Sequence, residues 1–147
     1  MAATSGPVGP VGRASERDSR PALITSISAV TLATHDMARS VQFYLALGFF
    51  LRYGGPTASF SSFSAGSGCL NVTTEGSERE WSWWGRIIFH VADVDRLYGQ
   101  AVAAGLQPQG APRDASWGER YFHITDPDGH ELSFAQPIAE PPAPGHG

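Results

Sequence analysis

Lysine is absent from this sequence, and all ten of its basic residues are arginines. The absence excludes Schiff-base chemistry at a lysine amine and the phosphate-binding lysine of a P-loop. Cysteine is almost absent as well, because Cys69 is the only one and no disulfide can form within the chain. We therefore expect a reducing, cytoplasmic setting in which Cys69 is a buried structural thiol.

Clusters of positive charge and long apolar runs are also missing. The formal net charge is −4 at pH 7, whereas a nucleic-acid-binding surface needs concentrated positive charge. Residues 1–22 lack the uninterrupted apolar stretch of a signal peptide. We expect a small-molecule ligand, and neither nucleic acid nor membrane, as the partner. The Gly/Pro/Ser-rich stretches 1–22 and 138–147 are expected to be disordered tails on a folded domain at 23–137.

The folded part contains an internal repeat. The stretch Ala29–Phe49, AVTLATHDMARSVQFYLALGF, aligns without a gap with Arg86–Leu106, RIIFHVADVDRLYGQAVAAGL. Each copy begins with an apolar, strand-like run, places an aspartate where a helix would start, and ends at a glycine. A unit of this size cannot bury its apolar face alone, so the two copies are expected to pair, with the functional site between them.

The periodicity predicts the order β-α-β-β-β in each copy. The first helix is expected after Asp36 and the second after Asp93. The apolar stripe of the first helix consists of Met37, Val41, Tyr44 and Leu47. The apolar stripe of the second consists of Val94, Leu97, Ala101 and Val102. The expected strands are 24–34, 49–53, 58–64 and 69–74, then 86–92, 107–113, 120–125 and 130–136.

A tight turn is predicted between the last two strands, at Asp126-Pro127-Asp128-Gly129. Proline fixes one backbone position of such a turn, and glycine accepts the left-handed one. Strand alternation places His130 on the face opposite to Glu131, so we expect the His130 side chain to be exposed.

The duplicated pattern, the helix RSVQFYLALGF, the segment FHVADVD and the closing WGERYFHITDPDGHELSF together resemble the vicinal oxygen chelate superfamily. Members include glyoxalase I, extradiol dioxygenases, fosfomycin-resistance enzymes and bleomycin-resistance proteins. The resemblance implies an α+β fold, in which two βαβββ modules at about 24–75 and 84–136 form a curved mixed sheet around a cavity. It also implies a homodimer, with the modules exchanged or packed side by side.

Metal-dependent members of that family place histidine or carboxylate ligands on the first and last strands of each module. Carried onto this sequence, those positions hold Ala29, Asn71, Arg86 and Ser133. Alanine offers no ligand atom and a permanently charged arginine repels a cation, so we expect neither a metal nor another cofactor. The alternative is a relocated metal site made of His90, His123 and Glu131, because two histidines and one carboxylate form an adequate set.

Arg86 is the first candidate for contact with an organic ligand, since a guanidinium can hold a carboxylate or phosphate through two hydrogen bonds. The alternative is a buried salt bridge from Arg86 to Glu131 or to a partner aspartate. Tyr121 and His123 alternate along one strand at positions where the family presents groups to its ligand, although His123 also suits a core or interface position.

Aromatic residues supply the second group of candidates. Trp83 and Trp84 lie in the run Trp81-Ser82-Trp83-Trp84-Gly85, which leads directly into Arg86. Indole rings suit stacking on a planar ligand or a dimer contact, and the alternative is that they pack the core or cover a strand edge. The family resemblance places Trp117 in a loop that acts as a lid.

Two functional hypotheses follow. The first is a protein that binds or sequesters a small aromatic or anionic molecule without a metal, in the manner of bleomycin-resistance proteins, and so confers antibiotic resistance. The second is a lyase, isomerase or dioxygenase-like enzyme, with a relocated metal site or with His90 or His123 as a general base. The expected ligand contacts are Ala29, Asn71, Trp83, Trp84, Arg86, His90, Trp117, Tyr121, His123, Glu131 and Ser133.

Overall fold

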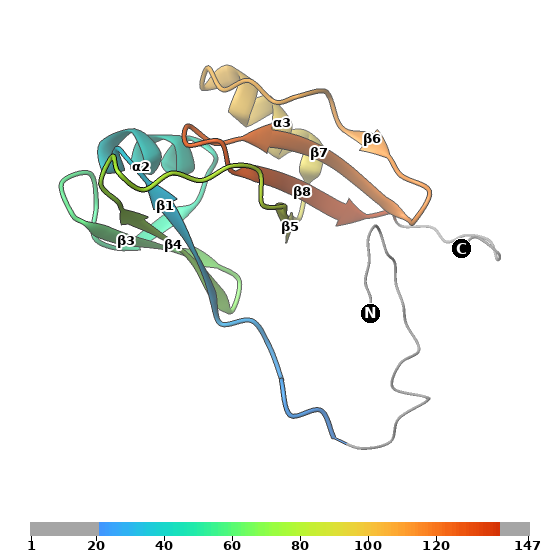
Figure 1. The fold of residues 1–147 in the computed structure, drawn as a ribbon. Helices are drawn as coiled ribbons and strands as arrows, with labels where there is room; N and C mark the ends of the chain where they lie inside the picture. Colours follow the sequence, from blue (N-terminus) through green and yellow to red (C-terminus); the bar gives the residue numbers. More distant parts are fainter. Residues whose placement is uncertain (1–20, 139–147) are drawn as a thin grey trace.

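The computed structural model describes residues 21–138, and the expected tails lie outside this range except for residues 21, 22 and 138. The predicted repeat is present as two βαβββ modules (Figure 1). Module 1 consists of β1 (Ala29–Thr34), α2 (Met37–Ala46), β2 (Phe50–Tyr53), β3 (Phe60–Ala65) and β4 (Gly68–Thr74). Module 2 consists of β5 (Arg86–His90), α3 (Val94–Ala103), β6 (Arg113–Asp114), β7 (Glu119–Thr125) and β8 (Glu131–Pro137).

Each module forms its own four-stranded mixed sheet. The strand orders are β1-β4-β3-β2 in sheet A and β5-β8-β7-β6 in sheet B, and the first strand of each module pairs in parallel with its last. Figure 1 shows the sheets side by side, with α2 over one and α3 over the other. The α+β class is therefore confirmed, as two sheets that form no closed barrel within the described residues. We call the face of each sheet opposite its helix the open face.

Both helices begin and end where the sequence predicts. The side chains of Asp36 and Asp93 each accept a hydrogen bond of 3.1 Å from the backbone N–H three residues later, which caps the first turn. Gly48 and Gly105 follow the helices with φ angles of 100° and 89°, a conformation that favours glycine. Within residues 21–138, neither helix combines the length and apolar character that a membrane crossing needs.

The apolar stripe of α2 is confirmed, because Met37, Val41, Tyr44 and Leu47 are all buried. The stripe of α3 was predicted wrongly at Val102, which is 47% exposed. Val102 lies about 100° around the helix from the buried Ala101, beyond the edge of the buried face. Tyr98 lies nearer to that face, and its ring contacts Phe122 at a centroid distance of 5.5 Å.

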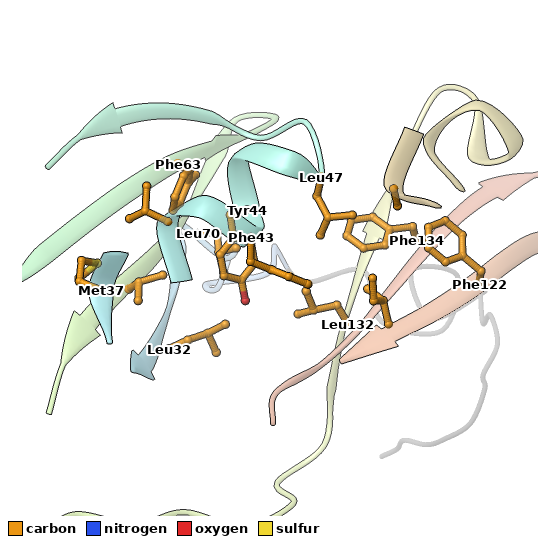
Figure 2. Packing of buried hydrophobic residues seen from close by; sticks show 14 of the residues in the cluster. Leu32, Met37, Phe43, Tyr44, Leu47, Phe63, Leu70, Phe122, Leu132 and Phe134 are labelled. Carbon is orange, nitrogen blue, oxygen red and sulfur yellow. The ribbon is translucent and has the colours of Figure 1, made fainter. Parts of the chain in front are cut away.

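One apolar core runs through both modules. Figure 2 shows Leu47, at the end of α2, pointing towards Phe134 of β8. The ring of Phe49 continues this contact, with centroid distances of 5.2 Å to Phe89 and 6.3 Å to Phe134. Because the same side chains fill the space under both helices, the modules form a single packing unit.

A buried carboxylate joins the two modules. The hydroxyl of Tyr44, on α2, donates a hydrogen bond of 2.6 Å to Oδ2 of Asp126, in the predicted turn between β7 and β8. Oδ1 of Asp126 accepts two backbone N–H groups of its own turn, from Asp128 and His130, at 2.9 Å each. Thr34 of β1 donates to the carboxylate of Asp128 at 2.5 Å. The turn that the sequence predicts therefore also docks module 2 onto module 1.

His130 is buried at this junction, so the prediction of an exposed side chain was wrong. Its Nε2 lies 2.8 Å from the carbonyl oxygen of Ala33, and its Nδ1 lies 2.8 Å from the indole Nε1 of Trp84. A carbonyl only accepts and an indole N–H only donates, so Nε2 carries the proton. The side chain does point away from Glu131, but module 1 covers that face.

The structure departs from the sequence predictions in three further places, two strands and one side chain. β1 begins at Ala29, later than the expected 24–34. The strand expected at 107–113 shrinks to β6, because Pro108 and Pro112 lack the N–H that a sheet ladder requires. Cys69 is only half-buried, and its sulfur accepts a hydrogen bond of 2.6 Å from the guanidinium of Arg52.

The junction gives the first prediction. Replacing Tyr44→Phe removes the hydroxyl from the buried carboxylate of Asp126, and we expect the free energy of unfolding at pH 7 to fall by about 1–3 kcal/mol. Chemical denaturation measures this change. The matched control is Tyr53→Phe, because Tyr53 is 66% exposed, and it is expected to change stability by less than about 0.5 kcal/mol.

The cost of Tyr44→Phe should also depend on pH. Burial raises the pKa of Asp126 in the folded protein above its ordinary 3.8. Protonation of Asp126 therefore stabilises the folded state fully below pH 3.8, and this stabilisation is lost as the pH rises through the folded-state pKa. The hydrogen bond from Tyr44 has the opposite effect on the pKa of Asp126, because it stabilises the ionised carboxylate and so lowers the pKa. The mutation should therefore cost less near pH 4 than at pH 7. An equal cost at both values would contradict this assignment.

Candidate functional site

The open face of sheet B carries most of the predicted site residues. Two rows of neighbouring residues cross this face: Tyr121, Ala135 and His90 in one, and His123, Ser133 and Ile88 in the next. The central members, on β8, are small, and their neighbours on β5 and β7 are large. A hollow of about 460 Å³ therefore lies over β8 between two rims of larger side chains.

Several predicted contacts line this hollow together: Trp83, Arg86, Trp117, Tyr121, His123 and Ser133. They come from the segment before β5 and from β5, the loop before β7, β7 and β8. The period-two alternation of the strands brings Tyr121 and His123 to the same face of β7, and the loops before β5 and β7 add Trp83 and Trp117. Glu131 also lies at this face, opposite Arg86 in the β5–β8 register.

Other predicted contacts lie elsewhere. Ala29 and Asn71 are on sheet A, where the Asn71 amide donates to the Thr31 hydroxyl at 3.3 Å. Trp84 lines a separate hollow of about 380 Å³ at the module junction, beside His130. Its indole N–H is taken by His130, so the structure does not place Trp84 at the hollow over β8.

A third hollow, of about 550 Å³, lies between the modules, and His90 is the single titratable residue in its lining. Apolar side chains and the Ser64–Ser67 hairpin turn supply most of the remainder. The hollow over β8 combines aromatic rings with charged and hydrogen-bonding groups, which are the features expected of a site that recognises an organic molecule.

Arg86 is both a lining residue and a partner of Glu131. Its Nη2 lies 2.7 Å from Oε1 of Glu131, and the two side chains are 37% and 24% exposed. Arg86 and Glu131 therefore do form the salt bridge that the sequence offered as an alternative, but the pair is half-exposed and not buried. Much of the Arg86 charge is therefore neutralised where it borders the hollow.

His123 lies on the β7 rim of the hollow in its neutral form. Burial lowers the pKa of the imidazole below its ordinary 6.5, and the positive charges of Arg86 and Arg113 lower it further, against an opposing effect of Glu131. Its Nδ1 is buried and has no hydrogen-bond partner within residues 21–138. At neutral pH this ring offers a ligand a neutral aromatic surface.

Glu119 is a site residue that the sequence interpretation missed. One carboxylate oxygen lies 2.5 Å from Nε2 of His90, and the other accepts the indole N–H of Trp117 at 3.0 Å. Because an ionised carboxylate only accepts, Nε2 of His90 donates the proton of this hydrogen bond, and Nδ1 is the ring nitrogen that Glu119 does not contact. Glu119 precedes Tyr121 by two residues, and the strand alternation that identified Tyr121 and His123 would have found it.

A series of aromatic rings runs along one rim. The ring of Trp117 stacks on that of Tyr121 at a centroid distance of 5.6 Å and an interplanar angle of 29°, and Tyr121 contacts His123 at 5.0 Å. Trp83 and Trp117 are 69% and 48% exposed. Large, exposed and rigid apolar surfaces beside a hollow favour contact with another molecule.

The residues present do not fit a divalent metal at the four positions given by the family resemblance. Ala29 has no donor atom, Arg86 is cationic, and Ala29 and Asn71 lie on a different sheet from Arg86 and Ser133. The relocated set does not assemble either. His90 binds Glu119 and Glu131 binds Arg86, and the described part of the chain holds no group of three or more His, Cys, Asp or Glu residues suited to a metal ion.

Comparison with known proteins gives one family and related structures. Residues 26–134 match the model of the Glyoxalase/Bleomycin resistance protein/Dioxygenase superfamily. A 50-residue stretch is 42% identical to an uncharacterised protein of Mycobacterium bovis; the match spans 34% of this chain and only 33% of that protein.

The fold resembles solved structures at low sequence identity. A glyoxalase/bleomycin resistance protein/dioxygenase from Nocardioides is 21% identical, with a TM-score of 0.64 and coverage of 85% of this chain and 93% of that one. A bleomycin-binding protein solved with bleomycin is 22% identical, with a TM-score of 0.61 and coverage of 77% and 98%. A lactoylglutathione lyase from Agrobacterium tumefaciens is 18% identical, with a TM-score of 0.63 and coverage of 78% and 96%.

The exposure of the Arg86–Glu131 pair gives the second prediction. Because both side chains reach water, we expect Arg86→Gln or Glu131→Gln to lower the free energy of unfolding by no more than about 1 kcal/mol. A double-mutant cycle by chemical denaturation measures the coupling directly. A loss of about 3–5 kcal/mol in either single variant would instead show that the pair behaves as a buried salt bridge.

Proposed function

This chain belongs to the glyoxalase/bleomycin resistance protein/dioxygenase superfamily, and we propose that it binds a small aromatic or anionic molecule on the open face of sheet B. The observation that carries this proposal is the hollow of about 460 Å³ over β8, which gathers six predicted contact residues. Its volume suits a small organic ligand, since such sites commonly measure roughly 300–1,000 Å³.

The lining residues supply complementary interactions. Trp83 and Trp117 offer exposed indole faces for stacking on a planar group. Ser133, on the floor, offers a hydroxyl that donates or accepts, and Arg86, on the rim, offers a guanidinium. Binding of this kind needs no bond to be made or broken, and it requires no metal.

Sequestration of such a molecule is the role we propose, in the manner of the bleomycin-resistance proteins. The fold likeness to a bleomycin-binding protein supports binding as a use of this fold, and antibiotic resistance would follow if the ligand is a toxic natural product. The misfit of Ala29 and Arg86 to a metal ion supports a protein that has lost the metal ligands of the family. A reducing, cytoplasmic location is proposed with it, because Cys69 has no second cysteine in the chain.

We also propose that a second copy of the chain completes the site. The hollow over β8 is open to solvent along the Ile88 side, where Ile88 is 61% exposed. The open face of sheet A carries Phe50 and Tyr53, which are 78% and 66% exposed, beside Phe60. In a homodimer with exchanged modules, this aromatic face of one protomer covers the hollow of its partner, and Ala29 and Asn71 come to the site with it.

Sedimentation equilibrium tests the homodimer. The wild-type chain is expected to sediment as a dimer, and Phe50→Glu should shift it towards the monomer, because the change places a charge in the proposed interface. The control is Leu45→Glu, on the outer surface of α2, where Leu45 is 46% exposed. A monomeric wild type, or equal effects of the two variants, would contradict this arrangement.

One observation favours an enzyme as the second candidate. The pair of His90 and Glu119 is the arrangement that orients a histidine as a general base, and Glu119 lines the hollow. Metal-free acid–base catalysis on a bound ligand is therefore the alternative function. Within this enzyme alternative, a lyase, isomerase or dioxygenase with a bound metal is less favoured than metal-free catalysis.

Elemental analysis, together with a thermal-shift screen of aromatic molecules in the presence and absence of divalent metals, tests the proposed function. We expect purified protein without stoichiometric metal, stabilised by an aromatic compound alone. For the best compound, Trp117→Ala should raise the Kd about tenfold, because it removes a stacking surface worth about 1–1.5 kcal/mol.

Leu45→Ala, on the outer surface of α2, serves as the control for a general loss of exposed apolar surface, and the Kd should change by less than about threefold. Stoichiometric metal together with stabilisation that depends on that metal would favour the enzyme instead. Failure of every compound in the screen to stabilise the protein would contradict binding of aromatic ligands.

A further inference from the structure

We propose that Arg113 and Tyr121 form an anion-binding site at the outer rim of sheet B, so that the ligand of the hollow over β8 is an aromatic anion. The inference rests on the proposed binding function and narrows it to one chemical class, a planar aromatic carboxylate or phenolate. Arg113 was not among the contact residues expected from the sequence.

The register of the sheet places Arg113 beside the hollow. Arg113 lies on the edge strand β6, directly opposite Tyr121 of β7, so the two side chains share the open face. The guanidinium carbon lies 4.8 Å from the centre of the Tyr121 ring, and Nε donates a hydrogen bond of 3.0 Å to the Tyr121 hydroxyl. The contact with the ring and the hydrogen bond together hold the guanidinium in one place.

Arg113 differs from the other arginines of sheet B because no carboxylate neutralises it. Arg86 is bound by Glu131 at 2.7 Å, and Arg120 by Asp95 and by a second aspartate at 3.0 Å each. Among residues 21–138, Arg113 forms no salt bridge, and its one side-chain hydrogen bond uses Nε. In the described part of the chain its two Nη groups therefore have no partner, and they can bind an anion.

The Tyr121 hydroxyl adds a second donor at the same place. Since its oxygen accepts the N–H of Arg113, its own proton is free to be donated to a ligand. A ligand oxygen near this point would meet a guanidinium N–H and a hydroxyl O–H together, and a negatively charged oxygen gains most from such a pair. The positive charge also reaches the inner end of the β7 rim, because Arg113 is one of the groups that lower the pKa of His123.

The spacing of the strands sets the size of the ligand. Neighbouring strands lie about 4.8 Å apart, so β6 lies roughly 10 Å from β8 across the open face. A ligand anchored at Arg113 must cross the Tyr121 rim to reach the space over Ser133 and Ala135. A bicyclic aromatic ring with one carboxylate has about this reach, and Trp117 and Trp83 lie beside its path.

Isothermal titration calorimetry with 2-naphthoate and its neutral counterpart 2-naphthamide tests the site. We expect the wild-type protein to bind the anion at least about tenfold more tightly than the amide. Arg113→Gln should abolish this preference and leave the affinity for the amide within about threefold. Arg113→Lys keeps the positive charge but loses the paired N–H groups of the guanidinium, so this variant should show part of the wild-type preference for the anion. Arg120→Gln is the matched control and should retain the preference, because Arg120 is paired with two aspartates and lies on the other face of β7, away from the hollow.

The possible outcomes separate this inference from the function on which it rests. If the wild type binds both probes equally, or if Arg113→Gln keeps the preference for the anion while remaining folded, the anion site is overturned and the binding function stands. If neither probe binds the wild type at millimolar concentration, binding of aromatic ligands is overturned and the anion site with it. Chemical denaturation of each variant confirms that it is folded at the titration temperature.

Discussion

The buried carboxylate of Asp126 determines how the two halves of this protein are arranged. One oxygen accepts a hydrogen bond from Tyr44 of module 1, and the other accepts two from the backbone of its own turn. Because Asp126 is buried, water cannot take the place of a lost partner. A carboxylate placed in such a position is costly unless it is fully hydrogen-bonded, so few relative orientations of the modules satisfy it. The orientation that does so places both helices on the same side of the two sheets (Figure 1).

The site over β8 follows from that arrangement. The turn that carries Asp126 also fixes where β7 ends and β8 begins, and therefore which residues face each other across sheet B. The register sets Ser133 beside His123 and Ala135 beside Tyr121, which makes the hollow. The duplicated halves have diverged in chemistry on this common scaffold: the open face of sheet B carries charged and hydrogen-bonding groups, and that of sheet A exposes the aromatic rings of Phe50 and Tyr53.

Much of this could be predicted from the sequence because it depends on neighbours along the chain. Helix caps, glycine ends, the turn and strand alternation are local; alternation placed Tyr121 and His123 on one face of their strand, and the family resemblance supplied the positions of Arg86 and Ser133. The errors concern contacts between segments far apart in the sequence. His130 is buried only because module 1 docks on it, and Trp84 serves the same junction. Arg113 could not be identified from the sequence, because only the tertiary structure shows which arginines of sheet B are paired with a carboxylate.

The central claim is that the ligand lies over β8 and not at the module junction, and the four tryptophans allow a direct test. The indole N–H groups of Trp81 and Trp84 are bonded within the junction, to Asp128 and His130, whereas Trp83 and Trp117 line the hollow over β8. We would record the four indole N–H resonances by NMR during titration with the ligand that binds best. The account predicts that the signals of Trp83 and Trp117 move and that those of Trp81 and Trp84 stay in place; movement of Trp81 and Trp84 alone would contradict it.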